Sequence, residues 1–307
     1  MKTAPRDFER GYQFLDAAHA GLNEGRAGAV LELAHQLREY RPELGAQWPE
    51  FARTHCRHHS VREKLHESPL SRRCFEQPRG YPGDPVTVDY IYGYNSMEGV
   101  SELGRAIYER ERVQTGCRSV RARRDLLAAK IDETALRVHR PRVLAIACGH
   151  LREAQKSEAV AAGKVGDFVA LDQDPESLAL VEREQAGVQP VRASIRSLLN
   201  RKPTFEQGFD LIYAAGLYDY LPDAVASRLT SILFGMLRSS GHLLLGNFHP
   251  DYPDAASMEA ILTWWLIYRD EQQMRGLASQ IDPMLIHEQS TFRDEYRNLV
   301  FLEMVRA

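Results

Sequence analysis

The chain has 307 residues, more than a single core usually holds, so one large and one smaller domain are expected. A formal net charge of −3 gives no basic footprint for neutralising phosphates, and a nucleic-acid partner is not expected. The four cysteines are too far apart for a disulfide framework or a zinc site, and no apolar run approaches a membrane span. These features predict a cytoplasmic protein that binds no metal and acts on a small molecule.

The first part of the chain, residues 1–135, has apolar residues at helical spacing and no convincing strand. Residues 1–75 are expected to form a small helical bundle, and further helices are expected over 100–115 and 119–137. Between them, residues 77–85 contain three prolines and two glycines, which forbid regular structure and predict a shaped loop. We expect a helical domain over 1–135 that closes as a lid over a site.

From residue 142 onward, short apolar runs alternate with helix-length segments, which is typical of βαβ units and a parallel sheet. We expect a doubly wound, mostly parallel, seven-stranded α/β domain over residues 136–307. The expected strands are 142–147, 167–172, 189–193, 209–214 and 242–247, followed by a hairpin of 284–290 and 299–305. The expected helices are 153–162, 175–185, 223–237 and 255–277.

The first two strands of this domain end in residues suited to a nucleotide-like ligand. The strand over 142–147 runs into Gly149, at the turn where backbone N–H groups meet such ligands. Asp172 ends the next strand 23 positions later, close to the ~20 expected for a ribose-binding acid. Asp174, just before Pro175, is the better helix cap. Asp172 is therefore left for the ligand.

The next two strands add candidates. Ser194 follows the third strand, where a polar side chain could meet an adenine edge or be an ordinary loop serine. Two tyrosines and an acid, Tyr218, Asp219 and Tyr220, follow the small residues after the fourth strand. We expect them to line a site rather than the core. The arginines near residue 120 are interpreted as a solvated helix face, with an anion site as the alternative.

Together, these strand ends resemble the class I S-adenosylmethionine-dependent methyltransferases over residues 140–307, including the closing hairpin. This sequence has Ala145 where the family carries an acid, and Ala147 and Leu151 where it carries glycines. The resemblance implies S-adenosylmethionine as the cofactor and gives each strand end a part of it. Ala147, Gly149 and Glu153 would line the methionine end, Asp172 the ribose, Ser194 and Ile195 the adenine, and Gly216, Leu217 and Tyr218 the sulfonium. Gln173 is a further cofactor-binding candidate.

A narrower resemblance comes from four segments, 79–84, 215–220, 246–249 and 265–269. They look like a bacterial subgroup that makes 3-hydroxypalmitic acid methyl ester, an extracellular signal. This resemblance implies methyl transfer to a small molecule, for example to the carboxylate of a hydroxy fatty acid.

For the reaction, we expect the loop from Tyr81 to Asp84 and the N-terminal helices to form a lid. The candidate catalytic side chains are Tyr81, Tyr218, Tyr220, Asn247 and His249. A carboxylate acceptor needs only placement, whereas a hydroxyl or amine needs a base, for which His249 or Asp219 are candidates.

Three alternatives stay open. The same cofactor could lose its aminocarboxypropyl arm or cyclise, which leaves methylthioadenosine instead of S-adenosylhomocysteine. A nicotinamide-dependent oxidoreductase also fits the βαβ pattern and Asp172, although residues 149–152 lack the glycines that pyrophosphate binding needs. The third alternative is a scaffold without catalysis, which the polar aromatic residues at 218–220 argue against.

Overall fold

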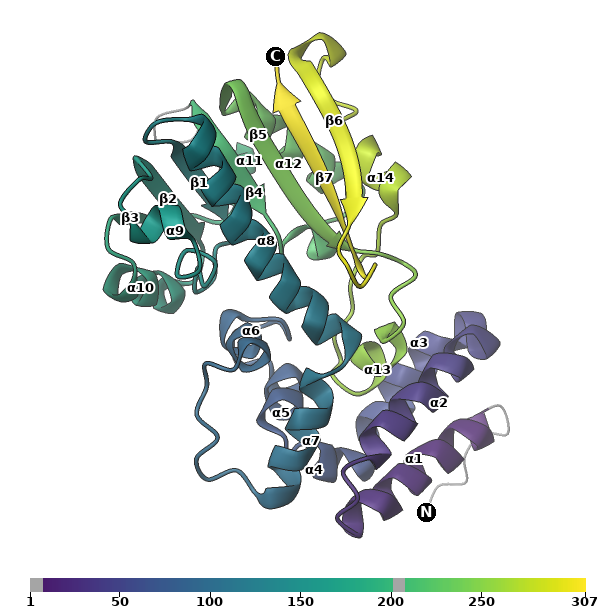
Figure 1. Cartoon of the computed structure of the whole chain (residues 1–307). Coiled ribbons are helices and arrows are strands. Elements are labelled where there is room, and N and C mark those ends of the chain that lie inside the picture. Colours follow the sequence, from purple (N-terminus) through teal and green to yellow (C-terminus); the bar gives the residue numbers. More distant parts are fainter. Residues whose placement is uncertain (1–7, 201–207) are drawn as a thin grey trace. The chain divides into compact units, whose positions relative to one another are not determined.

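The computed structural model describes residues 8–200 and 208–307, and the chain divides into two compact units (Figure 1). Unit 1 holds the described residues up to Val120 together with Tyr252–Trp265. Unit 2 holds those of Arg121–Asp251 and Leu266–Ala307. The division falls inside one long helix, Thr115–Arg137, and not at the expected boundary at residue 135.

Unit 1 is helical in the residues described. Its helices pack through apolar residues three or four positions apart, such as Leu15, Ala18 and Leu22 of the first helix, into one buried cluster. The helices are α1 (Glu9–Asn23), α2 (Ala29–Leu44), α3 (Trp48–Glu50), α4 (Val61–Leu65), α5 (Pro69–Glu76), α6 (Pro85–Tyr92), α7 (Glu102–Arg112) and α13 (Ala255–Ala260), with a π-helical segment at Phe51–Cys56.

Unit 2 is built on a seven-stranded sheet with the order β3-β2-β1-β4-β5-β7-β6. The first five strands along the chain are parallel, and β7 runs antiparallel to both β5 and β6. The predicted doubly wound, mostly parallel α/β fold with a closing hairpin is confirmed. The strands are β1 (Arg142–Ile146), β2 (Asp167–Asp172), β3 (Val188–Arg192), β4 (Phe209–Ala214), β5 (Leu237–Phe248), β6 (Ile286–Arg293) and β7 (Leu299–Arg306). The helices are α8 (Thr115–Arg137), α9 (Glu158–Ala161), α10 (Pro175–Glu184), α11 (Ile195–Asn200), α12 (Asp223–Gly235) and α14 (Glu271–Gly276).

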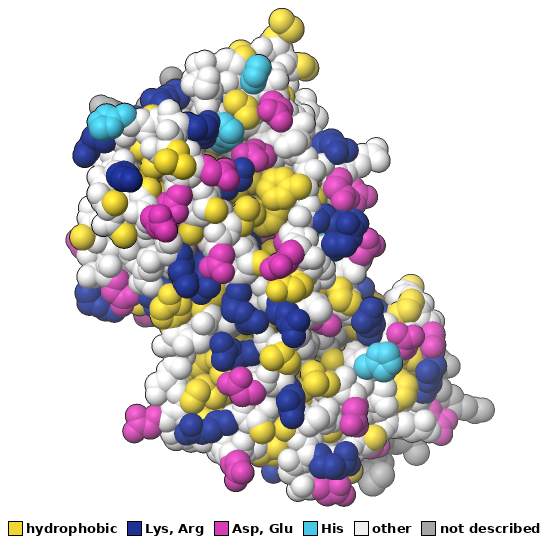
Figure 2. Space-filling view, in the orientation of Figure 1, with side chains coloured by type: hydrophobic (Ala, Val, Ile, Leu, Met, Phe, Trp, Pro, Cys, Tyr) yellow, Lys and Arg dark blue, Asp and Glu magenta, His cyan; other side chains and the backbone are white. Residues whose placement is uncertain are grey.

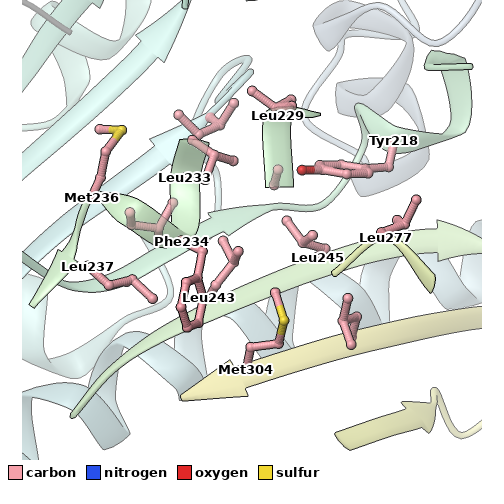
Figure 3. Close-up of a cluster of buried hydrophobic side chains, with 14 of the residues drawn as sticks. Tyr218, Leu229, Leu233, Phe234, Met236, Leu237, Leu243, Leu245, Leu277 and Met304 are labelled. Atoms are coloured by element: carbon pink, nitrogen blue, oxygen red, sulfur yellow. The ribbon is translucent and has the colours of Figure 1, made fainter. Parts of the chain in front are cut away.

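The two faces of this sheet are covered by different helices. Leu302 and Met304 of β7 belong to the apolar cluster that Leu229 and Leu233 of α12 fill (Figure 3). Glu303, between them, points to the opposite face, because side chains alternate along a strand. There its carboxylate oxygens lie 3.1 Å from the Lys130 Nζ of α8. Helices on both faces are what a parallel sheet requires.

Two expected helices differ from the structure. Residues 153–162 contain only the short α9, because the chain turns through a left-handed Leu151 and further turns before it. Residues 255–277 form α13 and α14 with an irregular segment between them. In that segment, the Ile267 N–H donates to the Asp219 carbonyl at 2.7 Å and the Arg269 N–H to the Phe248 carbonyl at 3.0 Å. These tertiary bonds replace the helical ones.

On the face seen in Figure 2, basic and acidic side chains are interspersed over each unit. Within residues 8–200 and 208–307, no helix is long and apolar enough to cross a bilayer. No group of three or more metal-binding side chains is placed to hold an ion in this part of the chain. The four cysteines are free thiols.

Candidate functional site

The turn after β1 has an unusual backbone. Ala147, Gly149 and Leu151 all have positive φ angles, of 51°, 54° and 50°. Glycine adopts this left-handed conformation freely, whereas other L-residues do so at a cost of about 1–2 kcal/mol each. The turn therefore keeps the backbone of a glycine-rich loop at two positions where the glycines themselves are missing.

Asp172, at the end of β2, is tied to this turn. Its Oδ2 accepts the Gly149 N–H at 2.8 Å, and its Oδ1 accepts the Asp174 N–H at 2.9 Å. The interpretation that Asp172 has no structural role was wrong, because its buried carboxylate joins the ends of two strands. Asp174 caps α10 as predicted, since its Oδ1 accepts the Glu176 N–H at 3.1 Å. Gln173, between the two acids, is exposed.

The end of β3 brings two half-buried candidates to the same edge of the sheet. The Ser194 Oγ accepts the Ser197 N–H at 3.1 Å, so this side chain caps the first turn of α11. Ile195 packs its side chain against the apolar cluster of unit 2. Both residues thus have local structural roles at the position where the sequence predicts the adenine.

After β4, one candidate turns out to belong to the core. Gly216 is exposed, and Leu217 and Tyr220 are half-buried. Tyr218 is instead fully buried in the apolar cluster, where its hydroxyl lies 3.1 Å from the Thr230 Oγ1 (Figure 3). Burial raises the pKa of the Tyr218 phenol far above its ordinary value. Because a side chain without exposed surface cannot contact a ligand, the expectation that Tyr218 lines the site is corrected here.

At the end of β5, Asn247 is also part of the core, and its predicted catalytic role was wrong. The Asn247 side chain is fully buried, and its Nδ2 donates to the carbonyls of Phe248 at 2.8 Å and Ile267 at 2.9 Å. Its Oδ1 accepts from the Arg269 Nη1 at 2.9 Å. Asn247 is therefore a structural link between β5 and the segment before α14, not a catalytic group. Arg269 itself pairs with Asp223, whose Oδ1 lies 2.7 Å from its Nη2.

His249 is also buried and engaged. Its Nδ1 accepts the Asp251 N–H at 3.0 Å, and its Nε2 lies 3.2 Å from the Glu271 Oε2. The Arg293 guanidinium contacts the same ring nitrogen and binds Glu271 as well. Both ring nitrogens thus have partners within unit 2, and no nitrogen is open to accept a proton from a substrate.

Sequence reasoning missed the arginines of α8. Arg123 and Arg124 were interpreted as part of a solvated face, but each is only 8% exposed. Arg123 donates to the Ala215 carbonyl, and its guanidinium lies 3.6 Å from the position that a Cβ on Gly216 would take. The signal that could have found them is the position of these arginines on a helix that must cover the sheet.

Two buried acids, Glu153 and Asp219, lie close enough to Arg123 to interact with its charge. The Glu153 Oε1 accepts a hydrogen bond from the Tyr213 hydroxyl at 2.8 Å. Burial raises the pKa of Glu153, and the positive charges of Arg123 and Arg124 oppose that shift. Asp219 accepts the Phe248 N–H at 2.7 Å, and burial raises its pKa to about 6. The carboxyl edge of β1 and β4 therefore holds buried groups of both charges.

The loop predicted over residues 77–85 lies in unit 1 and is irregular, as expected. Asp84 is fully buried and caps α6 by accepting the Thr87 N–H at 2.8 Å. The Arg73 guanidinium also holds it with two bonds of 2.9 and 2.6 Å. Tyr81 is half-buried. Asp84 is thus a structural residue of the loop.

Comparisons with known proteins show the fold. No protein-family model and no curated protein matches the sequence. A crystal structure of a possible exported protein from Bordetella parapertussis covers 99% of this chain and 99% of its own, with a TM-score of 0.62 and 18% identity.

Two other solved structures contain S-adenosylhomocysteine. The magnesium protoporphyrin IX methyltransferase of Synechocystis PCC 6803 covers 71% of this chain and 92% of its own, at 13% identity and a TM-score of 0.47. The match to the N-methyltransferase NodS of Bradyrhizobium japonicum WM9 covers 58% of this chain and 85% of the NodS chain, at 14% identity and a TM-score of 0.42. At such identities the likeness to these structures concerns the fold alone.

Proposed function

We propose that unit 2 binds S-adenosylmethionine and that the protein is a methyltransferase acting on a small molecule. The observation that carries this proposal is the turn after β1, where Ala147, Gly149 and Leu151 are all left-handed. Strained backbone of this kind persists where the surrounding structure holds it, and it gathers at ligand sites. In a doubly wound sheet, this turn is the place where the backbone approaches a nucleotide-like ligand.

The carboxyl edges of β1, β2 and β3 would hold the adenosine. Asp172 would accept from the ribose hydroxyls, because each carboxylate oxygen has capacity beyond the one backbone N–H it accepts. Exposed Gln173 lies beside it, and Ser194 and Ile195 would border the adenine. Ala147, which is also exposed, would lie against the cofactor.

The charged end of the cofactor would lie near the buried groups at the ends of β1 and β4. An amino-acid moiety carries one carboxylate and one ammonium group, and Arg123 and Glu153 offer the complementary charges. The exposed backbone of Gly216, against which the Arg123 guanidinium lies, would border the same end.

S-adenosylmethionine supplies a methyl group on a sulfonium, so the chain's own task is to orient the acceptor and exclude water. Both candidate bases, His249 and Asp219, are buried and hold structural hydrogen bonds. This favours an acceptor that is already ionised at neutral pH and needs no base. We therefore propose a carboxylate acceptor, such as that of a hydroxy fatty acid.

The central test is calorimetric titration of the full chain with S-adenosylmethionine. Asp172→Asn should weaken binding about tenfold, the amount expected for hydrogen bonds to a charged group. Asp167→Asn is the matched control, because Asp167 begins the same strand and its side chain is 62% exposed. Equal affinity in Asp172→Asn and the wild type, with an unchanged melting temperature, would remove the ribose assignment.

The reaction itself is tested by product analysis with a panel of acyl carboxylates. Methyl transfer releases S-adenosylhomocysteine, whereas the other uses of the cofactor release methylthioadenosine. Detection of methylthioadenosine alone would overturn the methyltransferase proposal.

We also propose that Tyr220 contacts the acceptor and that Tyr81 contributes to turnover. Tyr81→Phe should lower turnover more than cofactor affinity, whereas Tyr94→Phe, at an exposed tyrosine of the same unit, should change neither. Full turnover in Tyr81→Phe would count against the role of this residue.

A further inference from the structure

Unit 1 contains a pocket that the proposed function does not use. It has a volume of about 520 Å³, within the range of small-molecule sites. Its walls come from α2, the turn after it, α3 and the segment Tyr252–Trp265, so the pocket belongs to unit 1 alone. Figure 1 shows α13 beside α2 and α3. The lining side chains that matter here are Arg38, Arg41, Trp48, Pro49, Tyr252 and Trp265.

The charged side chains that line the pocket are all basic. Two arginines contribute, and none of the described lining residues is acidic. The remaining surface is provided by aromatic rings, prolines and alanines. Flat apolar walls accept a planar group by stacking, and a guanidinium fork matches the two oxygens of a carboxylate. This combination fits an organic anion with a flat apolar body.

The walls of the pocket are held in place from behind by Glu259, which is 2% exposed. Its carboxylate accepts from the Arg41 Nε and Nη2 at 3.0 and 2.9 Å, and from the Trp48 Nε1 at 2.7 Å. On the other side, the Arg53 guanidinium lies 4.2 Å from the ring centre of Trp265. The pocket is thus pre-organised, which lowers the entropic cost of binding.

The two arginines differ in how their charge is used. The charge of Arg41 is balanced by Glu259 in a bidentate pair. Arg38 is exposed, and no ion pair to it is found in the part of the chain that the structure describes. Arg38 therefore supplies the net positive charge of the lining.

We propose that this pocket binds an aromatic carboxylate, with the ring between Trp265 and the proline-lined wall and the carboxylate on Arg38. This site is independent of the cofactor site proposed in unit 2, because every residue that builds it lies in unit 1. A failure of S-adenosylmethionine to bind would therefore not contradict the proposal for this pocket.

The test uses 2-naphthoate and its neutral analogue 2-naphthamide, titrated calorimetrically into the full chain. The naphthoate should bind about tenfold more tightly than the amide, and its affinity should fall with added salt. Arg38→Gln should remove this preference. Arg26→Gln, at another exposed arginine of unit 1, should keep it. Trp265→Ala should weaken both probes.

Three outcomes would overturn the proposal. One is equal affinity for the acid and the amide in the wild type. Another is an unchanged preference in Arg38→Gln, which removes an exposed side chain and should fold normally. The last is no binding of naphthoate at about 10 mM, a concentration at which even a weak specific site is occupied.

Discussion

The left-handed turn after β1 makes a quantitative prediction for Ala147→Gly. An L-residue at a φ of 51° costs about 1–2 kcal/mol, which glycine does not. Glycine also destabilises the folded state by about 0.4–1 kcal/mol, because the unfolded chain gains conformational freedom that folding must remove. Because the Ala147 side chain is exposed, little burial is lost. The substitution should therefore stabilise the protein by about 0.5–1 kcal/mol, or raise its melting temperature by roughly 2 °C.

The assay is urea unfolding followed by circular dichroism, with two controls. Ala162 is also exposed in unit 2 but has a φ of −86°, so Ala162→Gly should destabilise by about 0.5–1 kcal/mol. Leu151 has a φ of 50° but is 1% exposed, so Leu151→Gly should lose about 2–4 kcal/mol through its cavity despite the relieved strain. If Ala147→Gly lost as much stability as Ala162→Gly, the strain at this turn would be refuted.

Three further predictions concern buried polar groups. Burial raises the pKa of Glu111 from 4.5 to about 7. The folded state thus holds its proton more tightly than the unfolded state does, and stability is lost as pH rises from about 4.5 through 7, by up to about 3 kcal/mol. Asp219 also has a raised pKa, so Glu111→Gln should lose less stability than the wild type over this pH range in urea unfolding, and an identical slope in both proteins would contradict the assignment. Tyr218→Phe should cost only about 1 kcal/mol and leave cofactor affinity unchanged in calorimetry, since the hydroxyl contacts only the core at Thr230; a lost affinity would restore Tyr218 to the site. Asp84→Asn should destabilise by about 2 kcal/mol in thermal unfolding, because it breaks the pair with Arg73, and an unchanged melting temperature would show that the pair is dispensable.

The sheet could be predicted from the sequence because each parallel strand is a short apolar run between turn residues. Both ends of β2 and of β4 match the expected ranges 167–172 and 209–214. The helix expected over 255–277 was wrong because the bonds of Ile267 and Arg269 to neighbouring strand ends outweigh the local periodicity. Sequence alone does not contain such long-range partners.

The same limit applies to the candidate site. Asp172 could be found because strand ends follow from the apolar pattern, and the structure does place its carboxylate at the turn of Gly149. Tyr218 and Asn247 could not be sorted into core and site, because the sequence does not show whether a polar side chain at or just after a strand end points into the core or toward a ligand. The burial of Arg123 was missed for the same reason: its charge suggested solvent, whereas its partners lie near β4.

The assignment of Tyr252–Trp265 to unit 1 has a consequence for biosynthesis. Ala256 and Ala260 complete the apolar cluster of unit 1, and Glu259 provides the buried partner of Arg41 and Trp48. The ribosome makes this segment only after all five parallel strands of unit 2. The N-terminal helices must therefore wait, incompletely packed, until most of the chain has been synthesised, and a fragment ending at Val120 should aggregate or bind chaperones rather than fold.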